Sequence, residues 1–162
     1  PVLTVPGPSA AVAALSVSGL PSDRFVFHGF FPRKASAIAA LLDEAAGFPA
    51  THVFYEAANR VEDALAAIAQ RLPGADCRLS RELTKLHEET VAGTPETLLE
   101  AVRATPPRGE CVLLVHVPRA ETVIPGGDAL RGLVHDAMSR RGLSRRDAVR
   151  AVAEETGLPR NA

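Results

Sequence analysis

The chain has 162 residues, of which 46% are hydrophobic and 23% are charged, and its formal net charge is −1. These values are ordinary for one globular domain with a small appendage, and they exclude a disordered chain or a globally basic nucleic-acid binder. From Gly126 onward the chain holds seven Arg residues against five Asp or Glu residues, so any attraction to RNA would be local.

The first half alternates turns, helices and strands. The turn Pro6-Gly7-Pro8-Ser9 predicts a helix over residues 9–17, because Pro is tolerated where a helix begins. We predict a strand over 24–27, a loop over 29–34, an amphipathic helix over 35–46 that Gly47 closes, and a strand over 51–55. Asn59 is expected to cap the next helix, whose apolar residues follow the helical period: Val61, Leu65, Ile68 and Leu72.

The second half begins with strands predicted over 77–83 and 89–92. Thr94 is expected to cap a helix that has Pro95 at its first position. Residues 110–117 form a continuous apolar run, which is typical of a strand buried on both faces of a sheet. Further helices are predicted over 128–141, from Ser144 with Asp147 completing a weak capping box, and from residue 159.

The alternation of strands and helices predicts an α/β layered fold. We expect an α/β domain over residues 1–117, a linker over 118–127 and a small helical module over 128–162 that is truncated at its C-terminus. The opening stretch is apolar and extended and has no initiator Met, so the N-terminal end is also expected to be a cut.

Several types of site are not expected. Cys77 and Cys111 lie far apart in apolar stretches, which favours buried, reduced thiols in a cytoplasmic protein. The five His residues lack the spacing of metal ligands, so no metal site is predicted. No apolar run reaches the roughly 18 residues that a membrane span needs, and no signal peptide is visible.

Four groups of segments together carry a family resemblance. They are residues 6–10 with 18–25 and 29–34; Val53-Phe54-Tyr55-Glu56 with Arg60; Arg81-Glu82-Leu83-Thr84-Lys85-Leu86-His87-Glu88-Glu89 with Gly93-Thr94; and the tail over 148–153 and 156–161. In this order they resemble the ribosomal RNA methyltransferases of the tetrapyrrole methylase superfamily. The resemblance runs over the whole chain and is weakest in the linker.

This resemblance implies two α/β domains with the methyl donor, S-adenosylmethionine, in the cleft between them. Relatives of this kind methylate the ribose 2′-hydroxyl of a cytidine in small-subunit (16S) ribosomal RNA. The chain would correspond to the C-terminal mixed-sheet domain and the helical module, with the N-terminal domain missing. A cleft with one wall cannot hold the donor rigidly or exclude water, so the fragment is expected to be inactive alone. A homodimer is the expected assembly, and 16S RNA or the small subunit the expected partner.

The resemblance also assigns candidate site residues. The donor-binding candidates are Pro6, Gly7, Tyr55, Glu56, Leu83, Thr84, Pro107 and Gly109. Lys85 and Glu82 are the catalytic candidates, which would orient the ribose or steady its oxygen. The alternatives stay open. Tyr55 would pack at a strand end, and Glu56 would form a cap or pair with Arg60. Residues 6–9 would be a turn that starts a helix, and residues 107–110 a plain turn. Arg81 with Glu82, and Lys85 with Glu88 or Glu89, would form a solvated charge cluster.

Cations supply the candidates for RNA contact. Arg33 and Lys34 follow Phe30 and Phe31, a composition suited to stacking on unpaired bases and touching phosphates. The alternative is a loop that folds its Phe residues into a core or a dimer interface. Arg145 and Arg146 are the candidates in the helical tail, where a solvated helix face is the alternative.

One departure from the family pattern concerns proton transfer. The family usually has Ser-Pro-His between the Glu and the Arg of the second motif, whereas this chain has Ala57-Ala58-Asn59. Asn59 could replace a hydrogen bond of that histidine but not its titration. Two other functions are considered: a methyltransferase for a tetrapyrrole, and a non-catalytic domain for dimerisation or interaction.

Overall fold

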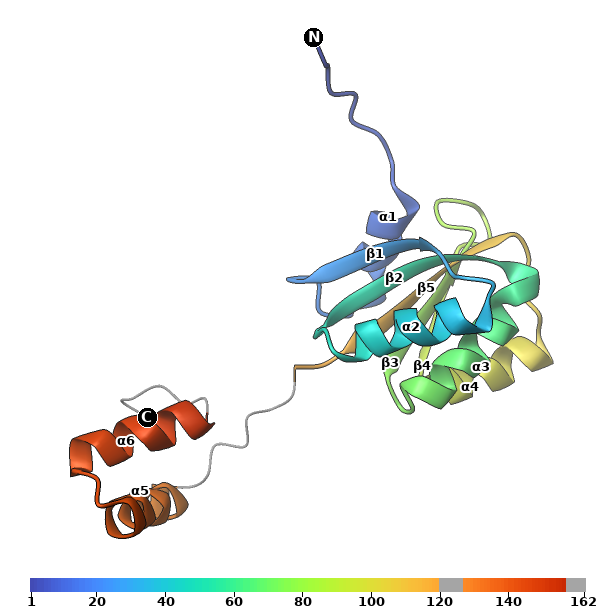
Figure 1. The fold of residues 1–162 in the computed structure, drawn as a ribbon. Coiled ribbons are helices and arrows are strands. Elements are labelled where there is room, and N and C mark those ends of the chain that lie inside the picture. Colours follow the sequence, from blue (N-terminus) through green and yellow to red (C-terminus); the bar gives the residue numbers. More distant parts are fainter. Residues whose placement is uncertain (120–126, 157–162) are drawn as a thin grey trace. The chain divides into compact units, whose positions relative to one another are not determined.

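The computed structural model describes residues 1–119 and 127–156 (Figure 1). The chain divides into two compact units, residues 1–119 and 120–162. Most of the predicted linker and the predicted third helix from residue 159 lie outside the described residues.

The larger unit contains a mixed five-stranded sheet in the order β1-β2-β5-β3-β4. Its strands are β1 (Phe25–Phe30), β2 (Ala50–Ala57), β3 (Asp76–Arg81), β4 (Glu89–Gly93) and β5 (Glu110–Val117). β1 pairs with β2 in parallel, and all other pairs are antiparallel. The predicted α/β class with a mixed sheet is therefore confirmed.

Helices cover the two faces of the sheet unequally. The first face packs on α2 (Ala35–Ala46), α3 (Val61–Arg71) and α4 (Pro95–Ala104), whose apolar residues surround Phe54, Leu113 and Val115. The second face packs on α1 (Ala10–Ser18), which covers Val53, Val112 and Leu114 (Figure 1). Alternate residues of β2 and β5 thus enter two separate cores, which explains their continuous apolar sequences.

The local predictions hold best where capping and periodicity agree. α2 and β5 have the predicted bounds, and the Thr94 hydroxyl accepts a hydrogen bond from the Thr97 N–H at 3.3 Å at the start of α4. The prediction for Asn59 was wrong, because Asn59 lies in the 3-10 helix η1 (Ala58–Arg60) and Arg60 precedes α3.

The loop predicted over 29–34 was also partly wrong. β1 continues to Phe30, with a register shift between Phe27 and Phe30 that Gly29 permits at a φ of 74°. Phe31 then turns into the core, where it is 2% exposed, whereas Phe30 is 61% exposed. The two adjacent Phe residues therefore have different surroundings, which their composition alone does not distinguish.

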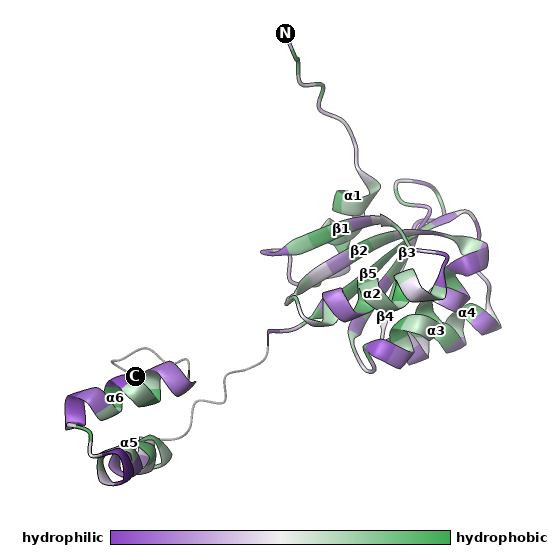
Figure 2. Cartoon of the chain, in the orientation of Figure 1, coloured by the Kyte–Doolittle hydropathy of each residue, from purple (hydrophilic) through white to green (hydrophobic). Residues whose placement is uncertain are grey.

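The smaller unit is a helical hairpin formed by α5 (Gly127–Arg141) and α6 (Arg145–Thr156). Its core contains Ala137, Ala148 and Val152, and hydrophilic residues alternate with these along both helices (Figure 2). The predicted capping of α6 is confirmed, because the Ser144 hydroxyl accepts from the Asp147 N–H at 3.2 Å and donates to its carboxylate at 2.7 Å.

Candidate active site

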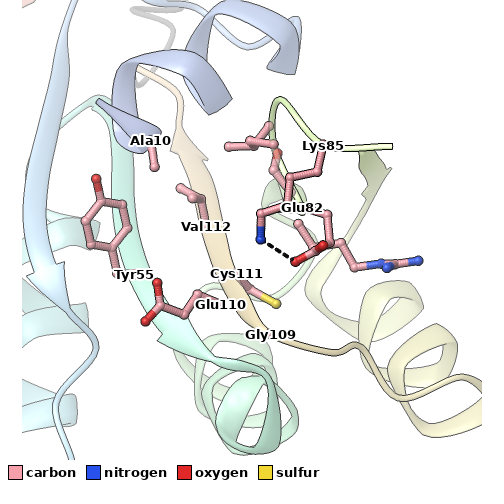
Figure 3. Close-up of a pocket in the computed structure, with 11 residues that line it drawn as sticks. Ala10, Tyr55, Glu82, Lys85, Gly109, Glu110, Cys111 and Val112 are labelled. Atoms are coloured by element: carbon pink, nitrogen blue, oxygen red, sulfur yellow. Dashed lines mark hydrogen bonds and ion pairs between the residues drawn. The ribbon is translucent and has the colours of Figure 1, made fainter. Parts of the chain in front are cut away.

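Four segments of the chain meet around a cavity of about 400 Å³ at one end of the sheet (Figure 3). The start of α1, the ends of β2 and β3, the loop after β3 and the start of β5 contribute the lining. The lining residues are Ala10, Tyr55, Ser80, Arg81, Glu82, Leu83, Lys85, Gly109, Glu110, Cys111 and Val112. Five candidates predicted from the sequence are thus brought together: Tyr55, Leu83, Gly109, Glu82 and Lys85.

The other donor-binding candidates lie elsewhere. Pro6 and Gly7 are exposed in the extended segment before α1, and no atom lies within 4 Å of the position that a Gly7 side chain would occupy. Thr84 is exposed in the loop after β3. Pro107 lines a neighbouring cavity of about 330 Å³ between β3, β4 and α4.

Tyr55 joins the cavity to the start of α1. Its hydroxyl accepts a hydrogen bond from the Ala11 N–H at 3.1 Å, whereas the Ser9 side chain makes no capping bond. The Tyr55 ring meets Phe27 and Phe30 edge-on, with centroids 4.8 and 5.7 Å away. The aromatic contacts and the hydrogen bond hold the Tyr55 ring between β1 and α1.

Glu82 and Lys85 form an ion pair in a strained part of the loop. Lys85 Nζ lies 3.0 Å from Glu82 Oε1, and the side chain of Lys85 is the more exposed of the two (Figure 3). Glu82 and Thr84 have positive φ angles of 51° and 66°, which are uncommon for residues with a side chain. Backbone strain of this kind is maintained by its surroundings and is frequent at functional sites.

Gly109 makes room for the Glu82 carboxylate. Its φ is 82°, and a Cβ atom built at this position would lie 3.0 Å from Glu82 Oε1. Its carbonyl also accepts a hydrogen bond from the Ala58 N–H at 3.0 Å, which ties the turn before β5 to η1. Glycine is therefore favoured here by its backbone conformation, and a larger residue would require the Glu82 carboxylate to shift.

The charged side chains of the loop after β3 have other partners than those considered in the sequence analysis. Arg81 Nε lies 2.7 Å from Glu89 Oε2, a residue opposite it in the β3–β4 pair, and Lys85 pairs with Glu82. Glu88 instead accepts a hydrogen bond from the Thr84 N–H at 2.6 Å. The described part of the structure does not contain the pairs that the alternative interpretation named, Arg81 with Glu82 and Lys85 with Glu88 or Glu89, because the turn after Arg81 redirects the chain.

Glu56 is buried and does not line the cavity. Its carboxylate pairs with Arg60 at 3.2 Å, as the alternative interpretation predicted. Its neighbour Tyr55 points to the α1 face because successive side chains of a strand alternate.

Six of the lining residues were not among the site candidates: Ala10, Ser80, Arg81, Glu110, Cys111 and Val112. Of these, Ala10, Arg81 and Glu110 lie in the motifs that supplied the candidates. Tyr55 lies opposite Val112 in the β2–β5 pair, and Ser80 lies opposite Val112 in the β3–β5 pair. These three residues therefore form one row across the sheet. The only signal that could have found Ser80 and Val112 is the strand register, which a single sequence does not reveal.

The four cationic candidates lie in different units. Arg33 and Lys34 are exposed just before α2, and Arg145 and Arg146 begin α6 beside a hollow of about 540 Å³ that also includes Val149 and Arg150. Within the described ranges, no acidic side chain forms an ion pair with any of these four candidates. Their charges are available to phosphate groups.

The composition of the cavity fits the donor that the resemblance implies. Its volume lies within the range of small-molecule sites, and Ala10, Leu83 and Val112 supply the apolar walls that an adenine ring needs. Glu82 and Glu110 supply carboxylates, which suit ribose hydroxyls and a cationic sulfonium. Among residues 1–119 and 127–156, no cluster of three or more His, Cys, Asp or Glu residues has the arrangement of a metal site, and no helix is long and apolar enough to cross a membrane.

The chain is similar to solved methyltransferases in fold. It superimposes on cobalt precorrin-4 methyltransferase CbiF with a TM-score of 0.54 at 17% identity, over 69% of this chain and 50% of that one. It superimposes on the methyltransferase CobJ with a TM-score of 0.50 at 20% identity, over 68% of this chain and 48% of that one. At these identities the likeness concerns the fold alone.

Sequence relatives are closer. The chain is 41% identical to ribosomal RNA small subunit methyltransferase I of Erythrobacter litoralis and 40% identical to that of Pseudomonas aeruginosa, in each case over 99% of this chain. It spans 56% and 57% of the lengths of these two relatives. Residues 1–99 match the family described as Tetrapyrrole (Corrin/Porphyrin) Methylases. The chain therefore belongs to the tetrapyrrole methylase family and is homologous over nearly its whole length to proteins named ribosomal RNA small subunit methyltransferase I.

Proposed function

We propose that this chain is the C-terminal part of an S-adenosylmethionine-dependent methyltransferase that modifies the ribose 2′-hydroxyl of a cytidine in 16S ribosomal RNA. The observation that carries the proposal is the meeting of Tyr55, Leu83 and Gly109 with the Glu82–Lys85 pair around one cavity. The names of the relatives support the RNA substrate. A cytoplasmic location follows from that substrate.

In this proposal the apolar walls of the cavity hold the adenosine of the donor. Leu83 and Val112 enclose the ring, and Glu82 or Glu110 accepts hydrogen bonds from hydroxyl groups. When bound, the donor supplies an electrophilic methyl group on a sulfonium. The protein has to align the 2′-oxygen with that methyl group, and positioning of this kind contributes much of the rate.

Lys85 is the candidate for stabilising the negative charge that develops on the ribose 2′-oxygen. A ribose hydroxyl is a poor acid, so a nearby cation lowers the cost of its deprotonation. Glu82, at 3.0 Å, keeps the Lys85 ammonium ion at the cavity. The family pattern described above has a histidine where this chain has Asn59, so the proposal assigns no proton transfer to this position.

The RNA would contact cations of both units. Arg33 and Lys34 lie on the unit that contains the cavity, and Arg145 and Arg146 lie on the helical unit. Phosphate contacts position a nucleic acid without reading its sequence, so these residues would contribute affinity rather than choice of nucleotide.

The chain spans little more than half the length of its relatives, and we propose that the second wall of the donor cleft lies in the portion that it does not cover. The cavity described above would then be half of the donor site. The chain alone would bind the donor weakly and transfer no methyl group, because solvent reaches the reacting atoms.

The proposal is tested by calorimetric titration of S-adenosylhomocysteine and by methylation of small ribosomal subunits. Both are carried out on this chain and on the full-length protein that contains it. We expect tight binding and 2′-O-methylation of one cytidine only with the full-length protein. Methylation of a tetrapyrrole, with no product in RNA, would favour the alternative substrate instead.

The exposed aromatic residues of the edge strand β1 favour a homodimer. β1 is an edge strand, and its residues Phe25, Phe27 and Phe30 are 45%, 47% and 61% exposed. An exposed apolar edge is prone to pair with another strand, and a second copy offers the same edge. Light scattering should give twice the monomer mass for the parent, and a monomer for the Phe25→Lys variant.

A further inference from the structure

The carboxylate of Glu56 is buried at the end of β2 and depends on one cation. Glu56 is 1% exposed, and its Oε1 accepts a hydrogen bond from the Ala57 N–H at 2.8 Å. The same oxygen pairs with Arg60 Nη1 at 3.2 Å, whereas Oε2 has no hydrogen-bond partner among the residues that the structure describes. A buried carboxylate without a counterion is strongly destabilising, so Arg60 is the residue that allows this charge in the interior.

The guanidinium of Arg60 also extends in a second direction. Its Nη2 donates a hydrogen bond to the carbonyl of Pro32 at 2.9 Å. One planar group therefore joins the end of β2 to the segment between β1 and α2. The fork geometry of arginine permits both contacts at once, and the single ammonium of a lysine does not reproduce them.

The segment that Arg60 holds leads directly into two of the cationic candidates, Arg33 and Lys34. Phe31 anchors it on the other side, because its N–H donates to the Tyr55 carbonyl at 2.9 Å and its ring packs on Phe54 with centroids 5.4 Å apart. Arg33 and Lys34 follow and are exposed. Both anchors act on β2, the strand whose Tyr55 lines the candidate donor cavity.

We infer that Arg60 is a positioning residue, which holds residues 32–34 at a fixed place relative to the donor cavity. This inference rests on the proposed function, in which Arg33 and Lys34 contact the RNA. When a fixed segment binds an RNA phosphate, the ribose beside that phosphate always takes the same position. A loose segment would have to become ordered on binding, and the entropy that it loses would weaken the affinity for RNA. Arg60 would thus act on RNA binding without touching the RNA or the donor.

The first experiment tests the fixed segment by limited proteolysis of this chain. Trypsin cleaves after Arg33 and Lys34, and mass spectrometry gives the rate at each site. The variants are Arg60→Lys, which loses the fork, and Glu56→Gln with Arg60→Gln, which also removes the buried charge. The control is Arg71→Gln, which breaks a surface ion pair with Asp43 at the other end of α3.

We expect cleavage after Arg33 and Lys34 to accelerate roughly tenfold in both test variants and to stay unchanged in the control. A tenfold change corresponds to the free energy of about one hydrogen bond to a charged group. Unchanged cleavage in the test variants would overturn the inference. An equal acceleration at all tryptic sites would overturn it as well, because it would reveal a general loss of stability rather than a released segment.

The second experiment separates this inference from the proposed function. In the full-length protein, Arg60→Lys should raise the KM for small ribosomal subunits roughly tenfold and leave the affinity for S-adenosylhomocysteine within twofold of the parent. A changed donor affinity with an unchanged KM would contradict the inference. If the Arg33→Gln/Lys34→Gln variant binds RNA like the parent, the proposed RNA contact fails, whatever the proteolysis shows.

Discussion

The hydroxyl of Tyr55 and the backbone N–H of Ala11 are joined by a hydrogen bond of 3.1 Å, which links a strand end to the start of a helix 44 residues earlier in the chain. Because the Ser9 side chain makes no capping bond, Tyr55 satisfies a donor that a capping residue usually satisfies. Tyr55 therefore has a structural task at the same place where it lines the candidate cavity.

The first prediction concerns this bond. Tyr55→Phe should lower the free energy of unfolding by about 1 kcal/mol, because the Ala11 N–H loses its partner. Ser9→Ala should change it by less than about 0.5 kcal/mol, although Ser at this position of a helix usually contributes about 1 kcal/mol. Urea denaturation measures both. A larger loss for Ser9→Ala than for Tyr55→Phe would contradict the capping role of Tyr55.

The second prediction concerns the contact between Gly109 and Glu82. Gly109→Ala should destabilise the fold by more than Gly74→Ala, although both glycines have similar φ angles of 82° and 71°. The backbone cost of about 1–2 kcal/mol is common to both positions, but only a Cβ at Gly109 approaches another group, Glu82 Oε1 at 3.0 Å. Equal losses in thermal unfolding would show that Glu82 moves aside freely.

The third prediction concerns Lys85. Lys85→Gln in the full-length protein should lower kcat at least about 100-fold, because a cation at the developing oxygen is lost. The free energy of unfolding should change by less than about 0.5 kcal/mol, since the Lys85 side chain is exposed and an exposed partner contributes little to an ion pair. Arg103→Gln, which breaks an exposed pair with Glu62, serves as the control and should leave kcat unchanged.

The fourth prediction concerns a histidine pair. His52 Nε2 donates to the Phe48 carbonyl, so its Nδ1 accepts from His28 Nε2 at 2.9 Å. Burial lowers the pKa of His52; the Phe48 hydrogen bond and the charge of Glu44 raise it in part, and His116 lowers it further. The pKa of His28 is lowered by burial and by His52. Protonation of His52 at Nδ1 would also remove the hydrogen bond between the rings.

A histidine whose pKa is lowered by folding binds fewer protons in the folded than in the unfolded chain at mildly acidic pH. The neutral histidine pair therefore contributes its full stability to the fold above about pH 6.5, the pKa of a histidine in the unfolded chain. This contribution decreases as the pH falls below that value. We expect the free energy of unfolding to fall between pH 7 and pH 5, and to fall less steeply in His52→Gln. The exposed His87→Gln variant should keep the slope of the parent.

The fifth prediction concerns the two thiols. Burial raises the pKa of Cys77 to about 12 and that of Cys111 to about 11, so little thiolate is present at pH 8. Both thiols should react with an aromatic disulfide reagent only as fast as the chain unfolds. Because Cys111 lines the candidate cavity, rapid labelling of Cys111 alone would mean that the cavity opens more than the structure shows.

Much of the local structure could be predicted from the sequence. The bounds of α2 and β5 and the caps at Thr94 and Ser144 depend on residues close together in the chain, and the structure confirms them. The family was also identifiable, because its motifs keep a fixed order along the chain. Five of the ten donor and catalytic candidates line the cavity, and these five belong to the motifs that end β2 and β3 or precede β5.

The tertiary structure decided the rest. Arg81 pairs with Glu89 because β4 lies beside β3, and Phe31 is buried while Phe30 is exposed because β1 shifts its register on β2. Ser80 and Val112 join Tyr55 only through the pairing of three strands. Periodicity and capping determine where an element begins and ends, since they act over one or two turns. The partner of a side chain depends on strand order and register, which are set by the burial of the whole sheet.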